Sequence, residues 1–119
     1  MYTFLIADDS KMTRITLQAM IESLYKNTTI YLVDDGVKVV EAYRKFSPNV
    51  VFMDISMPNR DGLEAARIIM QKDNNANIVM MTSHLGKGMQ LEAKALKAKA
   101  YLNKPLKIDE INQVLQKIL

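Results

Sequence analysis

The chain has 119 residues, 49% of them apolar and 24% charged, and this length and composition predict a single folded domain over residues 1–119. It contains no cysteine, which excludes disulfides and thiolate metal sites, and no apolar run long enough for a signal peptide or a membrane span. We therefore expect a cytoplasmic protein that does not insert into a membrane. The formal net charge is only +3, but residues 84–119 carry seven lysines against three acidic residues, so this segment is locally basic.

Short apolar runs alternate with amphipathic stretches five times along the chain. The apolar runs predict strands over residues 3–7, 30–33, 50–53, 78–81 and 100–103. The amphipathic stretches predict helices over residues 11–25, 36–46, 63–71, 87–98 and 108–119. Because strands that alternate with helices form right-handed crossovers, the pattern predicts a three-layer α/β fold, in which helices cover both faces of a doubly wound parallel sheet.

Two of the predicted helices have a recognisable apolar face. The first follows Ser10, a residue type that caps helix N-termini, and its buried face is predicted to contain Met12, Ile15, Leu17, Ala19, Met20 and Leu24. In the last helix, the residues expected to face the core are Ile108, Ile111, Val114, Leu115 and Ile118. The nine methionines are interpreted as core filler.

Polar residues follow four of the five predicted strands. Asp8 and Asp9 follow the first strand, Asp54 the third, Thr82 the fourth and Lys104 the fifth. In the flavodoxin-like strand order 2-1-3-4-5, the first and third strands are neighbours at the switch point where ligands bind. Three carboxylates, a hydroxyl and an ammonium group are therefore expected to meet at one edge of the sheet.

A pocket of three carboxylates without cysteine or histidine favours a hard cation, because adjacent carboxylates cannot all ionise cheaply without one. Mg²⁺ fits best, with Mn²⁺ as a substitute, since Mg²⁺ binds one or two carboxylates together with waters and phosphate oxygens. A carboxylate that faces a metal-bound phosphate can attack phosphorus and form an aspartyl phosphate. Thr82 and Lys104 would hydrogen-bond to the transferred group and neutralise it.

Four short motifs carry a family resemblance: ADDS at residues 7–10, FMDISMPNRDG at 52–62, MMTS at 80–83 and YLNKP at 101–105. Each is weak alone, but all four stand in order at strand ends. Together they resemble the receiver (CheY-like) domain of two-component response regulators, and the match runs over the whole chain. The resemblance implies one (βα)5 receiver domain with strand order 2-1-3-4-5.

By position, the resemblance implies roles for the residues at the predicted site. Asp54 corresponds to the phosphoacceptor. Asp8 and Asp9 correspond to the acidic pair that holds Mg²⁺ with Asp54, and Ser56 to the residue whose backbone carbonyl completes the metal ligands. Thr82 corresponds to the switch hydroxyl.

The fifth strand and the loop after the acceptor match the family as well. Lys104 corresponds to the phosphate-pairing lysine, and Tyr101 to the switch aromatic. The residues matched to structural positions are Pro58 and Gly62 in the loop and Pro105, which follows a peptide bond that is usually cis.

The resemblance implies a signalling switch and not an enzyme with a substrate of its own. A sensor histidine kinase, a phosphotransfer protein or a small phosphodonor would phosphorylate Asp54. The lysine-rich surface of the fourth helix, fifth strand and fifth helix would then change its partner preference. A downstream protein is the expected partner, and a second copy of the chain is the alternative. The lysines of this surface make an acidic partner, or weak nucleic-acid binding, a secondary hypothesis. Sequence-specific DNA binding is disfavoured, because no helix-turn-helix is left over.

Three positions modify these expectations. Ser56 and His84 stand two residues after Asp54 and Thr82, at positions that in the family tend to modulate the lifetime of the aspartyl phosphate. His84 is otherwise interpreted as an exposed loop residue. The segment LKAKAYL, residues 96–102, departs from the family's usual Ala-Gly-Ala turn, so the exit of the fourth helix is expected to differ.

Other functions were weighed against the switch. A Mg²⁺ phosphohydrolase of the haloacid-dehalogenase type has a second aspartate where this chain has Ser56. A nucleotide- or flavin-binding protein needs a glycine- or hydroxyl-rich loop where this chain has Asp8 and Asp9. A receiver that acts only as a constitutive interaction module is disfavoured by the intact phosphoacceptor, hydroxyl and lysine positions. Asp34 and Asp35 are interpreted as turn acids outside the site.

Overall fold

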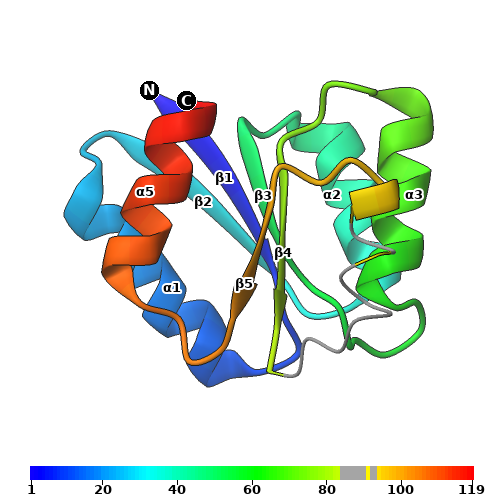
Figure 1. Cartoon of the computed structure of the whole chain (residues 1–119), viewed down its shortest axis with the longest axis horizontal. Helices are drawn as coiled ribbons and strands as arrows, with labels where there is room; N and C mark the ends of the chain where they lie inside the picture. The colour runs from blue at the N-terminus through cyan, green and yellow to red at the C-terminus, as the bar shows by residue number, and fades with distance from the viewer. Residues whose placement is uncertain (84–90, 92–93) are drawn as a thin grey trace.

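A computed structural model describes residues 1–83, 91 and 94–119 of the chain (Figure 1). In chain order its elements are β1 (Tyr2–Ala7), α1 (Lys11–Leu24), β2 (Thr28–Val33), α2 (Gly36–Phe46), β3 (Val50–Asp54), α3 (Gly62–Lys72), β4 (Ile78–Thr82), β5 (Ala100–Asn103) and α5 (Ile108–Ile118). Half of the residues of the helix predicted over residues 87–98 lie outside the described residues. All nine described elements were predicted, with ends that differ by at most two residues.

The five strands form one parallel sheet in the order β2-β1-β3-β4-β5, which confirms the predicted topology. Figure 1 shows α1 and α5 on one face of this sheet and α2 and α3 on the other. Because every strand runs the same way, all carboxyl ends lie at one edge. At that edge Ala7 is paired with Met53, Asp54 with Met81 and Thr82 with Asn103.

Two apolar clusters hold the layers together, one on each face of the sheet. Alternate residues of each central strand point to opposite faces, so Val51 and Met53 pack under α2 and α3, while Val50 and Phe52 pack under α1 and α5. All five residues of β3 and all five of β4 are buried, as expected for strands covered on both sides. The sequence therefore places its most apolar strands in the centre of the sheet.

Three of the described helices, α1, α2 and α3, begin at a residue whose side chain caps the helix. Ser10 Oγ accepts a hydrogen bond from the backbone N–H of Thr13 at 3.3 Å, which confirms Ser10 as the cap of α1. The carboxylate of Asp35 accepts from the N–H groups of the second and third residues after it and caps α2. Asp61 caps α3 in the same way, through the N–H of Glu64 at 2.8 Å.

The predicted buried face of α1 is wrong in part. Met12 is 74% exposed and Ile15 50% exposed, whereas the buried residues of this helix are Leu17 and Ile21. At 3.6 residues per turn, Met12, Ile15 and Ala19 lie on the side of the helix opposite Leu17 and Ile21. The apolar residues thus form two separate stripes, and only one of them contacts the sheet.

The first residue of α5 is also more exposed than predicted. Ile108 is 39% exposed, while Ile111 and Leu115 are fully buried and Val114 and Ile118 are partly buried against the core. Ile108 lies in the first turn, where the helix has only begun to approach the sheet. No helix in the described ranges has the length and apolar character of a membrane span.

The turn before β5 has a left-handed residue at Lys97, within the segment where the family usually has a glycine-containing turn. The expected difference at the exit of the fourth helix stays a prediction. Lys97 has a φ of 62°, in the left-handed region that favours glycine, and its N–H donates to the carbonyl of Lys94 at 2.9 Å.

We expect Lys97→Gly to raise the free energy of unfolding by about 0.5–1 kcal/mol, because glycine adopts this conformation without the steric cost that lysine incurs. Urea denaturation measures the change. The matched control is Lys99→Gly, two residues on, where φ is not positive and the substitution should lower stability instead. Equal effects of the two substitutions would contradict the prediction.

Candidate functional site

Three carboxylates meet at the carboxyl edge of the sheet. Asp8 and Asp9 follow β1, and Asp54 is the last residue of the neighbouring strand β3. One oxygen from each of these side chains lies within 4.8 Å of the others. Asp8 is fully buried and Asp54 is 4% exposed, whereas Asp9 is exposed and leaves the group open to solvent.

Lys104 brings one positive charge into this group from the end of β5. Its Nζ lies 2.6 Å from Asp8 Oδ2 and 3.5 Å from Asp54 Oδ1. The backbone N–H of Lys104 donates to the carbonyl of Thr82 at 2.8 Å, so the ends of β4 and β5 are joined beside the carboxylates. The peptide bond between Lys104 and Pro105 is cis, as the resemblance implied.

The surroundings of Asp54 raise the pKa of its carboxyl group from 3.8 to about 6. Burial is the main cause, and the negative charge of Asp8 adds to it. The ammonium group of Lys104 and the N–H of Ser56 act in the opposite direction, but they do not offset the loss of hydration. The single positive charge of Lys104 is therefore not enough to balance the negative charge around Asp54.

The donor set fits a hard divalent cation. All the side-chain donors are carboxylate oxygens, and Asp8 Oδ2 accepts no hydrogen bond within the described residues, where its contact is the ion pair with Lys104. Mg²⁺ prefers oxygen ligands and retains several waters, for which the exposed side of the group at Asp9 leaves room. Asp8, Asp9 and Asp54 could therefore hold a cation without rearrangement of the sheet.

Backbone hydrogen bonds hold the first strand and the acceptor loop in place. Asp8 Oδ1 accepts from the N–H of Ser10 at 2.9 Å, and the guanidinium of Arg14 donates to the backbone carbonyl of Asp8 at 2.7 Å. The N–H of Ser56 lies 3.4 Å from Asp54 Oδ1. Sequence reasoning missed Arg14, because its contact joins a helix to the strand before it and leaves no local motif.

The loop between β3 and α3 packs tightly on two glycines. The N–H of Gly62 donates to the carbonyl of Ile55 at 2.7 Å, and a Cβ at Gly62 would overlap the carbonyl oxygen of Asp54. A Cβ at Gly36 would overlap the carbonyl oxygen of Arg60 in the same loop. The carbonyl of Pro58 accepts from the N–H of Gly36 at 3.4 Å. These contacts fix the carbonyl of Asp54 and the loop that follows it.

The remaining predicted residues lie at or behind this edge. Thr82 is buried at the end of β4. Tyr101 is half-buried on β5, where it pairs with Met80 and packs against the core under α2 and α3. His84 lies outside the described residues.

The two acids after β2 do not belong to the carboxylate group. Asp34 forms an exposed ion pair with Lys38 at 2.9 Å. Asp35 caps α2 and accepts a hydrogen bond from the side-chain amide of Asn59 at 3.1 Å. Their interpretation as structural acids is confirmed.

Known proteins share this fold and sequence. The family profile of the response regulator receiver domain matches residues 4–116. A chemotaxis protein CheY from Listeria monocytogenes is 33% identical over 120 residues, which is 98% of each chain. Among solved structures, the CheY chain in a CheX–CheY–BeF3–Mg complex from Borrelia burgdorferi aligns with a TM-score of 0.91 and 27% identity. The alignment covers 98% of this chain and 88% of that one.

A further solved structure bears on the carboxylate group. The receiver domain of a sensor histidine kinase from Pseudomonas aeruginosa has a TM-score of 0.87 at 25% identity, over 98% of this chain and 96% of that one, and carries a magnesium ion in its active-site cleft. The family profile spans nearly the whole chain, and a curated relative at 33% identity covers 98% of it. The chain therefore belongs to the response regulator receiver domain family of two-component signalling proteins.

Proposed function

We propose that the chain is a switch whose Asp54 accepts a phosphoryl group from a histidine kinase or a phosphotransfer protein. The observation that carries the proposal is the position of the Asp54 carboxylate, which lies beside Asp8 and Asp9 and 3.5 Å from the ammonium group of Lys104. This arrangement supports phosphoryl transfer, because the reaction depends on neutralising charge on the transferred group.

Asp8, Asp9, Asp54 and the backbone carbonyl of Ser56 would hold Mg²⁺, or Mn²⁺ in its place. The bound ion would supply positive charge that lets a phosphate and the carboxylates share one pocket. One carboxylate oxygen of Asp8 and one of Asp9 lie within 4.8 Å of each other and of an oxygen of Asp54, and the proposed role of Asp8 and Asp9 is to bind the ion.

Asp54 is the proposed nucleophile of the phosphoryl transfer. One carboxylate oxygen attacks phosphorus, the new O–P bond forms as the P–N bond of phosphohistidine breaks, and imidazole leaves with the bonding electron pair. Lys104 neutralises an oxygen of the transferred group, and the hydroxyl of Thr82 hydrogen-bonds to another. Tyr101 would then change position and carry the signal to the outer face of β5. Hydrolysis of the aspartyl phosphate resets the switch, so the chain turns over no separate substrate.

The apolar stripe that α1 leaves uncovered supports a protein donor. Met12 and Ile15 are exposed on this stripe, and Met12 also lines a groove of about 190 Å³ together with Thr16, Lys104 and Leu106. The groove lies beside the lysine that contacts Asp54, so a helical partner seated there would bring its phosphohistidine close to the acceptor. The cytoplasm, where a kinase of this kind would find its ATP, is the proposed location of the chain.

The lysine-rich side of β5 and α5 is proposed as the output surface. Lys99 and Lys107 are exposed there, and Tyr101 lies on the same strand. An acidic face of a downstream protein would complement these charges. A second copy of the chain is the alternative occupant.

Intact mass after incubation with acetyl phosphate tests the proposal. The wild-type chain should gain one phosphate when Mg²⁺ is present and none when Mg²⁺ is removed by chelation. Asp54→Asn should gain none under either condition, because the amide is not a nucleophile. Asp34→Asn, which alters an acid outside the carboxylate group, is the matched control and should be phosphorylated like the wild type.

A phosphate adduct on the Asp54→Asn protein would show that another residue accepts the phosphoryl group. The absence of any adduct, together with no phosphate released from acetyl phosphate, would leave a constitutive interaction module as the function. Rapid hydrolysis is distinguished by the release of phosphate without a stable adduct.

The lifetime of the phosphorylated state is expected to depend on Ser56 and His84. Ser56 is exposed at the rim of the site and its N–H contacts the Asp54 carboxylate, so a larger side chain there would restrict the approach of water. Substitution of Ser56 by Met, and of His84 by Ala, should change the decay rate of the phosphate adduct, measured by intact mass over time. An unchanged decay in both variants would contradict this expectation.

A further inference from the structure

A cavity of about 320 Å³ lies between α2 and α3, away from the carboxylates. We call it the α2–α3 cavity. It is formed by the C-terminal halves of the two helices, whereas α3 meets Asp54 at its opposite end, through Gly62. Its volume falls within the range of small-molecule sites in proteins. None of the residues assigned to the phosphorylation site lines it. Its lining residues are Val40, Tyr43, Arg44, Ser47, Ile68, Ile69, Lys72 and Asp73.

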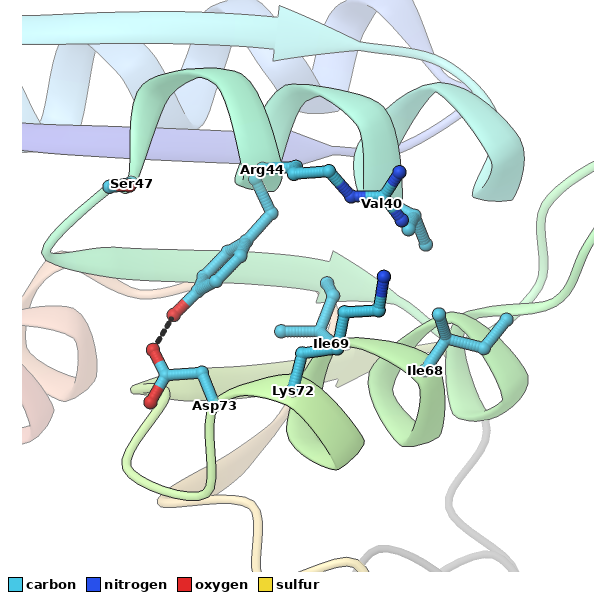
Figure 2. A pocket seen from close by; sticks show the side chains of 8 residues that line it. Val40, Arg44, Ser47, Ile68, Ile69, Lys72 and Asp73 are labelled. Atoms are coloured by element: carbon cyan, nitrogen blue, oxygen red, sulfur yellow. Dashed lines mark hydrogen bonds between the residues drawn. The ribbon is translucent and has the colours of Figure 1, made fainter.

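The wall of the cavity combines apolar side chains with two positive charges. Val40, Ile68 and Ile69 supply the apolar part. Figure 2 shows that the charged ends of Arg44 and Lys72 point toward one another from the two helices. Neither forms an ion pair with any carboxylate in the described part of the chain.

The acid that lines the cavity is already engaged. The hydroxyl of Tyr43 donates to Asp73 Oδ2 at 2.6 Å, and Figure 2 shows Asp73 at the end of the cavity away from the charged tip of Arg44. Burial and the nearby Asp73 carboxylate raise the pKa of Tyr43, so the phenol keeps its proton. The charged ends of Arg44 and Lys72 therefore remain the positive side of the cavity.

Basic residues near helix C-termini often serve only to complement the helix dipole. Two features of Figure 2 distinguish this case. The guanidinium of Arg44 lies beside Val40 and away from Ser47, where α2 ends, and the ammonium of Lys72 is directed toward α2. The two exposed charges thus face each other at the cavity, where an anion placed between them would be attracted by both.

We propose that the α2–α3 cavity binds a small organic anion, with its carboxylate or phosphate group between Arg44 and Lys72 and its apolar part against Val40 and Ile69. Arginine and lysine both bind such head groups through charge-assisted hydrogen bonds. The apolar wall would exclude fully hydrated inorganic ions in favour of a molecule with a hydrocarbon part. This site is independent of phosphorylation at Asp54.

Amide chemical shifts of the full chain test the proposal in the absence of Mg²⁺. The probes are 2-naphthoate, 2-naphthyl phosphate and the neutral 2-naphthamide. At least one anion should shift the amides of the C-terminal halves of α2 and α3 and bind with a Kd of about 1 mM or tighter, as expected for a ligand of this size. Comparison of the carboxylate with the phosphate identifies the preferred head group, and the neutral amide should bind about tenfold more weakly than that anion.

Substitution of both basic residues of the cavity tests whether their charges bind the anion. Arg44→Gln combined with Lys72→Gln should weaken binding of the anion about tenfold. The matched control, Lys45→Gln combined with Lys117→Gln, removes two exposed charges outside the cavity and should leave the Kd within about twofold. Equal binding of 2-naphthamide, an unchanged Kd in the Arg44 and Lys72 variant, or no saturable binding of either anion would each overturn the proposal.

Discussion

Replacement of Asp54 by asparagine is expected to stabilise the metal-free protein at neutral pH by about 2–3 kcal/mol. The Asp54 carboxylate has a pKa of about 6 in the folded protein, against 3.8 as its ordinary value, because it is buried next to Asp8. Each unit of pKa difference corresponds to about 1.4 kcal/mol of free energy. At neutral pH the Asp54 carboxylate is ionised, and burial of this charge lowers the free energy of unfolding. Asparagine removes that charge and keeps nearly the same shape.

The effect should depend on pH in a defined direction. The pKa of Asp54 is raised in the folded state, so its contribution to stability is fully present below about pH 4 and is lost as the pH rises through about 6. The advantage of Asp54→Asn should therefore be largest above pH 6 and shrink as the carboxylate becomes protonated. Urea denaturation of both proteins across this range measures it.

A control and a second condition sharpen this test. Glu22→Gln changes an exposed acid on α1 and should alter stability by no more than about 0.5 kcal/mol. Mg²⁺ should stabilise the wild type more than Asp54→Asn, because the variant lacks one of the three carboxylates that would hold the ion. A destabilised Asp54→Asn protein at neutral pH would show that the carboxylate is better compensated than its neighbours indicate.

The edge of the sheet that carries the site could be predicted from the sequence alone. Asp54 and Thr82 each end an uninterrupted apolar run, and a run of that kind indicates a strand buried on both faces. Once the strands are parallel, their carboxyl ends must share one edge, so the meeting of Asp8, Asp54 and Lys104 follows from order along the chain.

Features that depend on angle or on distant contacts could not be predicted in this way. The apolar residues of α1 were assigned to one face, but Met12 and Ile15 lie opposite Leu17, and only their angular positions on the helix separate the two stripes. The α2–α3 cavity is lined at one end by a hydrogen bond between Tyr43 and Asp73, residues distant in the sequence. Neither residue carries a local signal of that contact.

Substitution of Gly62 by alanine is expected to lower the free energy of unfolding by about 2–4 kcal/mol. A Cβ at this position would overlap the carbonyl oxygen of Asp54 and lie 2.8 Å from its carbonyl carbon and 3.0 Å from the Cα of Ile55. All three neighbours are backbone atoms at the end of a fully buried strand, so they cannot move aside as a flexible side chain would. Either β3 or the start of α3 must shift.

Two opposing effects make the sign of this result informative. Gly62 is the first residue of α3 and its φ is not positive, so helix propensity alone would favour alanine by up to about 1 kcal/mol. In urea denaturation, a lower free energy of unfolding for Gly62→Ala would show that the backbone overlap dominates, and a higher one would show that helix propensity dominates. Gln71→Ala, at an exposed position of the same helix, is the matched control and should change stability by no more than about 0.5 kcal/mol. A Gly62→Ala protein as stable as the wild type would contradict the packing argument.

The same substitution should slow phosphorylation, because the backbone that must shift belongs to Asp54 itself. Gly36→Ala provides a graded comparison, since its Cβ would overlap the carbonyl oxygen of Arg60, in a loop and not at the end of a strand. A loop yields more readily than a central strand, so Gly36→Ala should cost less stability and affect the reaction with acetyl phosphate less than Gly62→Ala does. A larger loss of phosphorylation in Gly36→Ala would place the critical backbone support in the loop, away from the end of β3.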